Sequence, residues 1–145
     1  MKTEQQAIGR TKGGLNTKLA AAVDRRGRAV GLALAAGPRH DLYAVEPLLP
    51  SLQGRRVVAD KGFDADTFRS RLRRQRSTSC IPPKRGRRRR VPFHHGYYRR
   101  RHQVENFFCR IKRHRRISTR YEKLASRFLS FVQLAVVLDW LTRRF

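Results

Sequence analysis

At 145 residues the chain is long enough for one modest domain with a hydrophobic core, and its 39% hydrophobic content argues against disorder. A formal net charge of +25 is far outside the balance of an ordinary globular protein and indicates a polyanionic partner, with nucleic acid as the first candidate. Cys80 and Cys109 are too few for a zinc module or a disulfide framework, and no signal peptide is recognised at the start, so we expect a cytosolic protein with reduced thiols.

The order of the predicted elements is typical of an α/β domain with a small mixed sheet. In chain order they are a strand hairpin at residues 17–37, a short helix at 40–52, a short buried strand at 54–60, a helix at 64–76, a short strand at 77–83, a basic loop at 83–96, and helices from 97 to 145.

Particular residues set the boundaries of these elements. The hairpin turn is expected at residues 24–27, and Asp41 is expected to cap the following helix. The strand at 54–60 ends at Asp60. The late stretch "FLSFVQLAVVLDWL" contains a glutamine and an aspartate and is short for a bilayer, so we expect a buried helix and no membrane partner.

The positive charge is concentrated in the second half of the chain. Residues 69–120 hold 20 of the 35 Lys and Arg residues and a single acid, Glu105. The stretch "KRGRRRR" places six cations in seven positions and predicts salt-dependent binding to phosphates, although a solvated loop is the alternative. The residues expected to bind DNA are Lys61, Lys84, Arg85, Arg87, Arg88, Arg89, Arg90, Arg110, Arg113, Arg115 and Arg116.

The lone acid in this basic region has a specific spacing. Tyr98, Arg101, Glu105 and Lys112 are 3, 4 and 7 residues apart, which places all four on one narrow stripe of a helix. Arg101 and Glu105 would make a routine i,i+4 ion pair worth only ~0.2–0.5 kcal/mol. A functional interpretation is that Glu105 and the strand-end Asp60 converge on hard divalent cations, which support phosphodiester chemistry.

These residues resemble a known family. The pattern Tyr98-x2-Arg101-x3-Glu105-x6-Lys112 is similar to the signature of bacterial insertion-sequence transposases of the DDE type, and "VVADKGFDAD" resembles the segment that carries their second catalytic aspartate, here Asp60. The resemblance covers nearly the whole chain. It implies a ribonuclease H-like fold with flanking helices, and cutting and rejoining of double-stranded DNA at element ends and targets. It also implies Mg²⁺ dependence, with Mn²⁺ as a substitute, metal ligands Asp60 and Glu105, and catalytic roles for Tyr98, Arg101 and Lys112.

The resemblance also implies that residues 1–145 are a partial catalytic domain. The first aspartate of the family precedes the "GRTKGGL" segment, and Asp24 does not replace it because it lies in the predicted hairpin turn. We therefore expect the first sheet strand to be lacking and the isolated chain to be inactive. An upstream reading frame would supply the missing segment, or the chain is a decayed remnant.

Two further expectations follow from the resemblance, and one alternative stays open. An active form is expected to be a homo-oligomer located on the nucleoid in the cytoplasm. The alternative is a non-enzymatic basic nucleic-acid-binding protein, in which Asp60 and Glu105 would be dispensable.

Overall fold

The centre of the molecule is a long β-hairpin. The computed structural model describes residues 6–143, and in it strands β2 (Gly14–Val23) and β3 (Ala29–Ala36) pair antiparallel from Thr17↔Ala36 to Val23↔Ala29. A short strand, β1 (Gly9–Thr11), adds to the start of β2 to give the order β1-β2-β3. The hairpin was predicted from the sequence, whereas β1 was not.

The hairpin turn is closed by an aspartate and a glycine. The Asp24 carboxylate accepts hydrogen bonds from the backbone N–H groups of Arg26 and Arg28, at 2.8 and 3.0 Å. Gly27 adopts φ +73°, a conformation that side-chain-bearing residues rarely take. Asp24 is therefore occupied as a turn residue, as its position in the sequence predicts.

A second, smaller unit lies beside the hairpin. Strands β4 (Arg56–Val58) and β5 (Thr78–Cys80) pair parallel, and they are connected through a 3₁₀ turn, η2 (Lys61–Phe63), and helix α2 (Asp66–Arg74). The predicted α/β class is confirmed. The expected mixed sheet is instead two separate sheets, one antiparallel with three strands and one parallel with two.

The segment that joins the two units begins with helix α1 (Asp41–Val45) and continues as the 3₁₀ helix η1 (Glu46–Leu52). The prediction that Asp41 caps α1 was wrong. The cap is His40, whose ring Nδ1 accepts a hydrogen bond from the Leu42 backbone N–H at 3.3 Å. Asp41 instead forms an ion pair with Lys18 of β2 at 2.7 Å.

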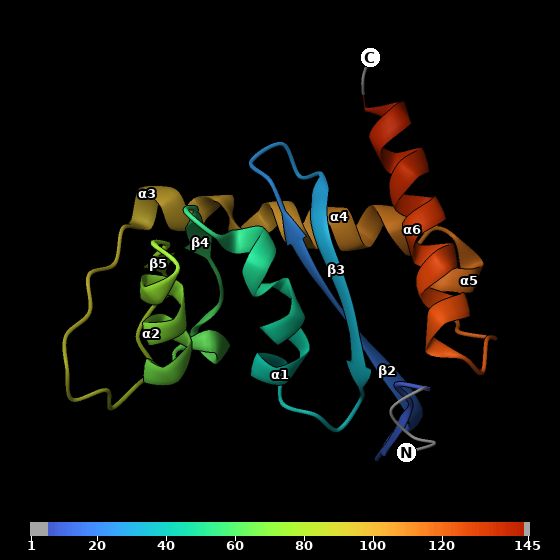
Figure 1. Cartoon of the computed structure of the whole chain (residues 1–145), viewed down its shortest axis with the longest axis horizontal. Coiled ribbons are helices and arrows are strands. Elements are labelled where there is room, and N and C mark those ends of the chain that lie inside the picture. The colour runs from blue at the N-terminus through green and yellow to red at the C-terminus, as the bar shows by residue number, and fades with distance from the viewer. Residues whose placement is uncertain (1–5, 144–145) are drawn as a thin grey trace.

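The C-terminal part of the described chain is helical, as predicted, with more interruptions than expected. It consists of α3 (His95–Tyr98), the 3₁₀ turn η3 (Arg99–Arg101), α4 (His102–Ile111), α5 (Arg115–Ser118) and α6 (Ala125–Thr142). Figure 1 shows α3 and α4 running in line from the side of β4 and β5 to the side of α6, which stands at one side of the hairpin.

Each unit has its own hydrophobic core. The larger core joins the hairpin to the C-terminal helices and contains Ala29, Phe107, Ile111, Ile117, Phe128, Val132 and Ala135. The smaller core lies between β4, β5 and α2 and contains Val57, Phe68, Leu72 and Ile81. Because α3 and α4 lie against both units, they position the residues of one unit relative to the other.

Helix α6 is only partly buried. Phe128, Val132, Ala135 and Asp139 face the core, whereas Leu134, Val137, Leu138 and Leu141 are 44–57% exposed. The prediction of a buried helix was therefore wrong for its outer face. By length and composition alone α6 could cross a membrane, with a mean hydropathy of 1.2, but the core helices of soluble proteins meet the same criterion.

Candidate active site

Asp60 lies just beyond the carboxyl end of β4. It occupies the N-cap position of η2 with an extended backbone, φ −68° and ψ 161°. Its side chain is 52% exposed. The sequence predicted this position from the apolar run that precedes Asp60, and a strand end of this kind presents its side chain toward neighbouring elements rather than into the core.

The helical segment α3–η3–α4 brings three further side chains to Asp60. The Tyr98 hydroxyl donates a hydrogen bond to Asp60 Oδ1 at 3.1 Å. One guanidinium nitrogen of Arg101, Nη1, donates to Glu105 Oε1 at 2.6 Å and to Asp60 Oδ2 at 3.4 Å. The structure thus joins two carboxylates that are far apart in sequence through one arginine.

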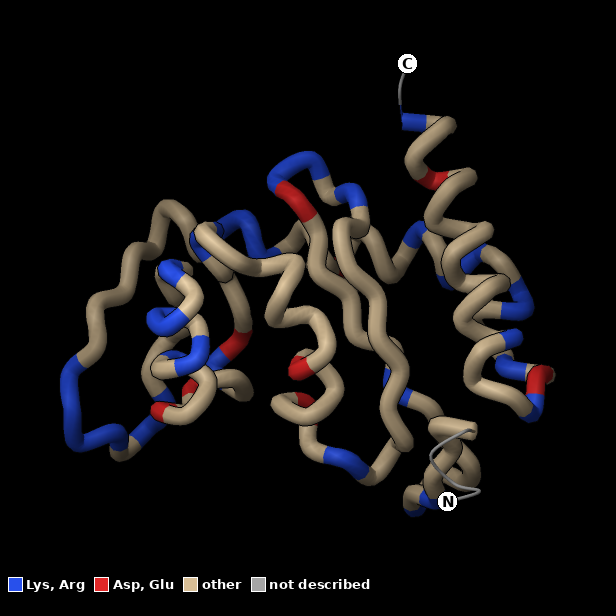
Figure 2. The backbone as a smooth tube through the Cα atoms, viewed as in Figure 1, with Lys and Arg blue, Asp and Glu red and all other residues tan. Residues whose placement is uncertain are grey.

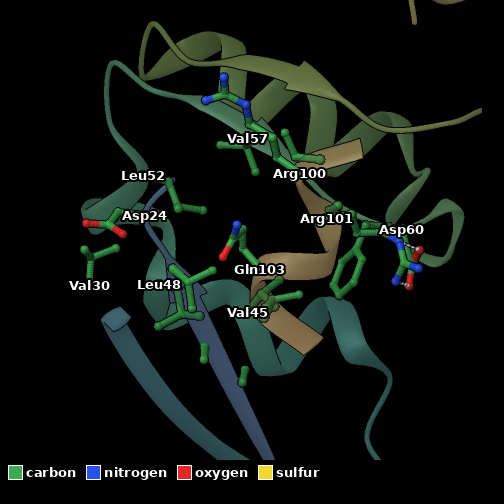
Figure 3. Close-up of a pocket in the computed structure, with 18 of the residues that line it drawn as sticks. Asp24, Val30, Val45, Leu48, Leu52, Val57, Asp60, Arg100, Arg101 and Gln103 are labelled. Carbon is green, nitrogen blue, oxygen red and sulfur yellow. Dashed lines mark hydrogen bonds and ion pairs between the residues drawn. The ribbon is translucent and has the colours of Figure 1, made fainter. Parts of the chain in front are cut away.

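The helix holds these side chains in place because its other face is anchored. Phe107 and Ile111 of α4 are fully buried in the larger core, on the face opposite Glu105. Phe93 packs edge-on against the ring of Tyr98, with 5.1 Å between ring centroids. Figure 3 shows Arg101 and Asp60 in contact at one end of a cavity.

The electrostatics of the cluster keep both donors protonated. Partial burial, the hydrogen bond to Asp60 and the negative charge of Asp60 raise the pKa of Tyr98 above its usual value of 10.0. The hydrogen bond to Glu105 and the charge of Asp60 raise the pKa of Arg101. Two carboxylates therefore face one cation, and the cluster retains a net negative charge in an otherwise strongly positive protein.

The two carboxylates of the cluster are the type of ligand that binds a hard divalent cation. Asp60 and Glu105 are both about half exposed and converge on a shared positive group, the Arg101 guanidinium. Carboxylate oxygens are the ligands that Mg²⁺ and Mn²⁺ prefer. Within residues 6–143, however, no group of three or more His, Cys, Asp or Glu side chains is arranged to hold a metal. The cluster accounts for two ligands.

Lys112 does not join this cluster. It follows the last residue of α4, and its ammonium lies 5.9 Å from the ring centroid of Phe108. It lines a separate cavity of about 370 Å³. Since seven residues of helix separate Lys112 from Glu105, its Cα lies roughly 10 Å further along the axis.

The basic residues predicted to bind DNA fall into two groups. Most are exposed, and Figure 2 shows those of the loop after β5 as two neighbouring blue stretches at one edge of the molecule. The exposed ones are Lys61, Lys84, Arg85, Arg88, Arg89, Arg90, Arg113, Arg115 and Arg116.

Arg87 and Arg110 are instead bound to acids of the same chain. Arg87 forms ion pairs with Asp64 and Asp66 and is only 11% exposed. Arg110 donates to both oxygens of Asp139, at 2.6 and 3.0 Å, and to the carbonyl of Gly27 at 2.7 Å. These contacts occupy the two guanidiniums within the fold. Neither contact could be predicted from local sequence patterns, because the partners of Arg110 are 29 and 83 residues away.

A large cavity separates the two sheets. It measures about 1160 Å³ and lies between β2 and β4 (Figure 3). Its walls are largely apolar, with Val45, Leu48 and Val57 among the side chains, and Asp60 and Arg101 lie at one end. The edges of β2 and β4 that face this cavity belong to different sheets and do not pair with each other.

Comparison with known proteins identifies relatives over almost the whole chain. Residues 1–140 match the family model described as "Transposase DDE domain". The chain is 35% identical over 129 residues to the "Putative transposase for insertion sequence element IS6501" of Brucella ovis, an alignment that covers 88% of this chain and 99% of the relative. No solved structure matches the chain.

Proposed function

Since this chain belongs to the transposase DDE domain family, whose members act in DNA transposition, we propose that it contributes Asp60 and Glu105 as metal-binding carboxylates to a site that cuts and rejoins DNA at insertion-sequence ends. The observation that carries the proposal is the convergence of these two carboxylates on the single guanidinium of Arg101. A strand end and a helix that are distant in sequence meet at one half-exposed point next to a large cavity.

The family generally uses a divalent metal, and Mg²⁺ is the proposed ion here, with Mn²⁺ as a substitute. Asp60 and Glu105 would hold it, and the ion would supply charge neutralisation for the attacking and leaving oxygens of a phosphodiester. Arg101 offsets part of the negative charge of the two carboxylates. With a metal held by Asp60 and Glu105, the Arg101 guanidinium would be able to turn toward a DNA phosphate, because it would no longer be the cation that balances these carboxylates.

Tyr98 positions Asp60. Its hydroxyl remains protonated at neutral pH and donates to Asp60 Oδ1. The oxygen that would hold a metal is then Oδ2, which accepts only a long hydrogen bond of 3.4 Å from Arg101. Lys112 is placed differently. At roughly 10 Å along the helix from Glu105 it would contact the DNA backbone a few phosphates away from the reacting bond.

We further propose that a β-strand supplied by another segment fills the cavity between β2 and β4 and unites the two sheets in a ribonuclease H-like arrangement. One residue of a buried strand occupies roughly 160 Å³, from about 3.3 Å of rise, 4.8 Å of strand spacing and 10 Å of layer separation. A cavity of about 1160 Å³ therefore corresponds to roughly seven residues, an ordinary strand length. Such a strand would end beside Asp60, where it would supply a third carboxylate.

The proposed partner is double-stranded DNA, bound through the exposed cations of the loop after β5 and of the α4–α5 region. The active form would be an oligomer in the cytoplasm, on nucleoid DNA. Without the additional strand the chain would bind metal weakly and cut DNA poorly, since two carboxylates leave most of the coordination sphere to water.

The experiment is a transposition assay in cells with the insertion element that encodes this chain, since the element provides every segment that the reaction needs. We expect Asp60→Asn and Glu105→Gln each to reduce transposition by at least about 100-fold, because the loss of a residue that only supports a metal ligand already costs roughly 10–100-fold in metal affinity or activity. Asp41→Asn is the matched control, because Asp41 is another exposed carboxylate in a single ion pair. Unchanged transposition in both site variants would favour the non-enzymatic nucleic-acid-binding role instead.

A further inference from the structure

Five exposed arginines that form no ion pair with a carboxylate of residues 6–143 line the large cavity. They are Arg25, Arg26, Arg55, Arg56 and Arg100. We call this set the arginine rim. Resting on the proposed function, we propose that the arginine rim is a second DNA-backbone site, which holds the phosphates of the duplex on the side of the cut away from the basic loop.

The rim is assembled from three parts of the chain. The first two arginines belong to the turn between β2 and β3, the next two to the start of β4, and Arg100 to η3. Figure 2 shows the blue segments of the turn and of the α3–η3 region along the same edge of the molecule. Four of the five come from the half of the chain with little excess charge, so the sequence alone does not indicate this cluster.

The nearest acid does not neutralise the rim. Asp24, which lines the same cavity, is already paired with Arg28 at 2.8 Å and accepts two backbone hydrogen bonds. Burial opposes ionisation of this carboxyl, but the hydrogen bonds from Arg28 and Arg26 outweigh it and lower its pKa. Asp24 and Arg28 therefore cancel each other, and within residues 6–143 no carboxylate forms an ion pair with any of the five rim guanidiniums.

Contacts within the fold fix two parts of the arginine rim in place. The guanidinium of Arg56 is stacked on the ring of Tyr97 with 3.8 Å to the centroid, which fixes the start of β4 against α3. The turn that carries Arg25 and Arg26 is fixed by Arg110, which donates to the carbonyl of Gly27. Like charges held together in this way repel one another, and a phosphate backbone is the ligand that relieves the repulsion.

The distance between the arginine rim and the proposed cutting site has an upper limit, set by the separation of Arg56 and Asp60. Arg56 and Asp60 are four residues apart along an extended segment, so they are separated by at most about 13 Å. Phosphates of one strand recur every ~3.4 Å along a duplex. Arg56 would therefore hold the backbone at most about four nucleotides from the bond that Asp60 and Glu105 face.

The test is the salt dependence of duplex binding by the full chain in EDTA, measured by fluorescence anisotropy. Each lost phosphate contact lowers the slope of log K against log[salt] by about 0.9, so Arg25→Gln/Arg55→Gln should lower it by about 1.8. The control is Arg73→Gln/Arg74→Gln, a pair of exposed arginines on α2 that does not line the cavity. Its slope should fall much less. Thermal unfolding of both variants verifies that they are folded.

A rim variant with the wild-type slope, or a control variant that loses as much as the rim variant, overturns the proposal. Neither result affects the carboxylates, because binding in EDTA does not require them. Conversely, if Asp60 and Glu105 proved dispensable for transposition, the slope measurement would still decide whether the rim binds DNA. A chain without salt-dependent duplex binding would contradict both proposals.

Discussion

Replacing Arg110 should reduce the stability of the protein without weakening its contact with DNA. Its position in a run of basic residues predicts a phosphate contact, but the structure binds its guanidinium to Asp139 and to Gly27. Arg110→Met removes both contacts and leaves the Asp139 side chain, which is 8% exposed, without its counter-ion. The variant therefore distinguishes a structural cation from a DNA-binding one.

The magnitude follows from the burial of the pair. Removing one partner of a fully buried ion pair costs about 3–5 kcal/mol. The Arg110 side chain retains 23% exposure, so solvent screening lowers the expected loss to roughly 2–3 kcal/mol. For a chain of this size such a loss lowers Tm by roughly 6–12 °C. Urea unfolding followed by circular dichroism measures it directly.

The matched control is Arg113→Gln, since Arg113 is exposed and forms no ion pair with the described carboxylates. We expect it to lower the salt slope of duplex binding by about 0.9 and to leave Tm unchanged. The double variant Arg110→Met/Asp139→Leu should recover much of the lost stability, because no uncompensated charge remains. The reasoning is refuted if Arg110→Met leaves Tm unchanged and lowers the salt slope as much as Arg113→Gln.

Three other measurements test separate parts of the structure. Burial opposes ionisation of the Asp64 carboxyl, but hydrogen bonds from the Lys84 amide and the Arg69 guanidinium outweigh it and lower the pKa of Asp64 below 3.8. The ionised Asp64 therefore stabilises the folded protein above pH 3.8, and this stabilisation is lost as the pH falls through the folded-state pKa. Asp64→Asn should therefore unfold with a weaker pH dependence below pH 4, and an unaltered acid transition would contradict this. Arg101→Gln should bind Mn²⁺ several-fold more tightly in a fluorescence or calorimetric titration, because the competing guanidinium is gone, and weaker binding would show that Arg101 is needed to hold Asp60 in place. Asp60→Asn should lower the pKa of Tyr98, since it removes the charge that helps to raise it, and the difference in ultraviolet absorbance between this variant and the same variant with Tyr98→Phe isolates that phenol.

The sequence predicted the local features of the fold well and its long-range features poorly. The hairpin at β2 and β3, the strand before Asp60, and the helical segment η3–α4 that carries Arg101 and Glu105 all follow from short-range periodicity and turn residues. The cap of α1 was misplaced because Lys18, 23 residues away in sequence, pairs with Asp41. Helix-capping propensities describe only local sequence and do not predict a contact of this range.

In the candidate site, too, the local features were predicted and the long-range ones were not. The spacing of Tyr98, Arg101 and Glu105 placed them on one helical face, and the structure directs this face toward Asp60. Lys112 shares the stripe but lies beyond the end of α4, so periodicity alone overstated its proximity. The arginine rim was missed altogether, because it forms only when the β2–β3 turn, the start of β4 and η3 meet around one cavity.

The most direct test of the central claim is Mn²⁺ binding by the purified chain, followed by electron paramagnetic resonance. The claim is that Asp60 and Glu105 together form a metal site. It predicts weak but measurable binding that is lost in Asp60→Asn and in Glu105→Gln and is retained in Asp41→Asn, with all variants folded by circular dichroism. Equal Mn²⁺ binding by the wild type and by both site variants would contradict it.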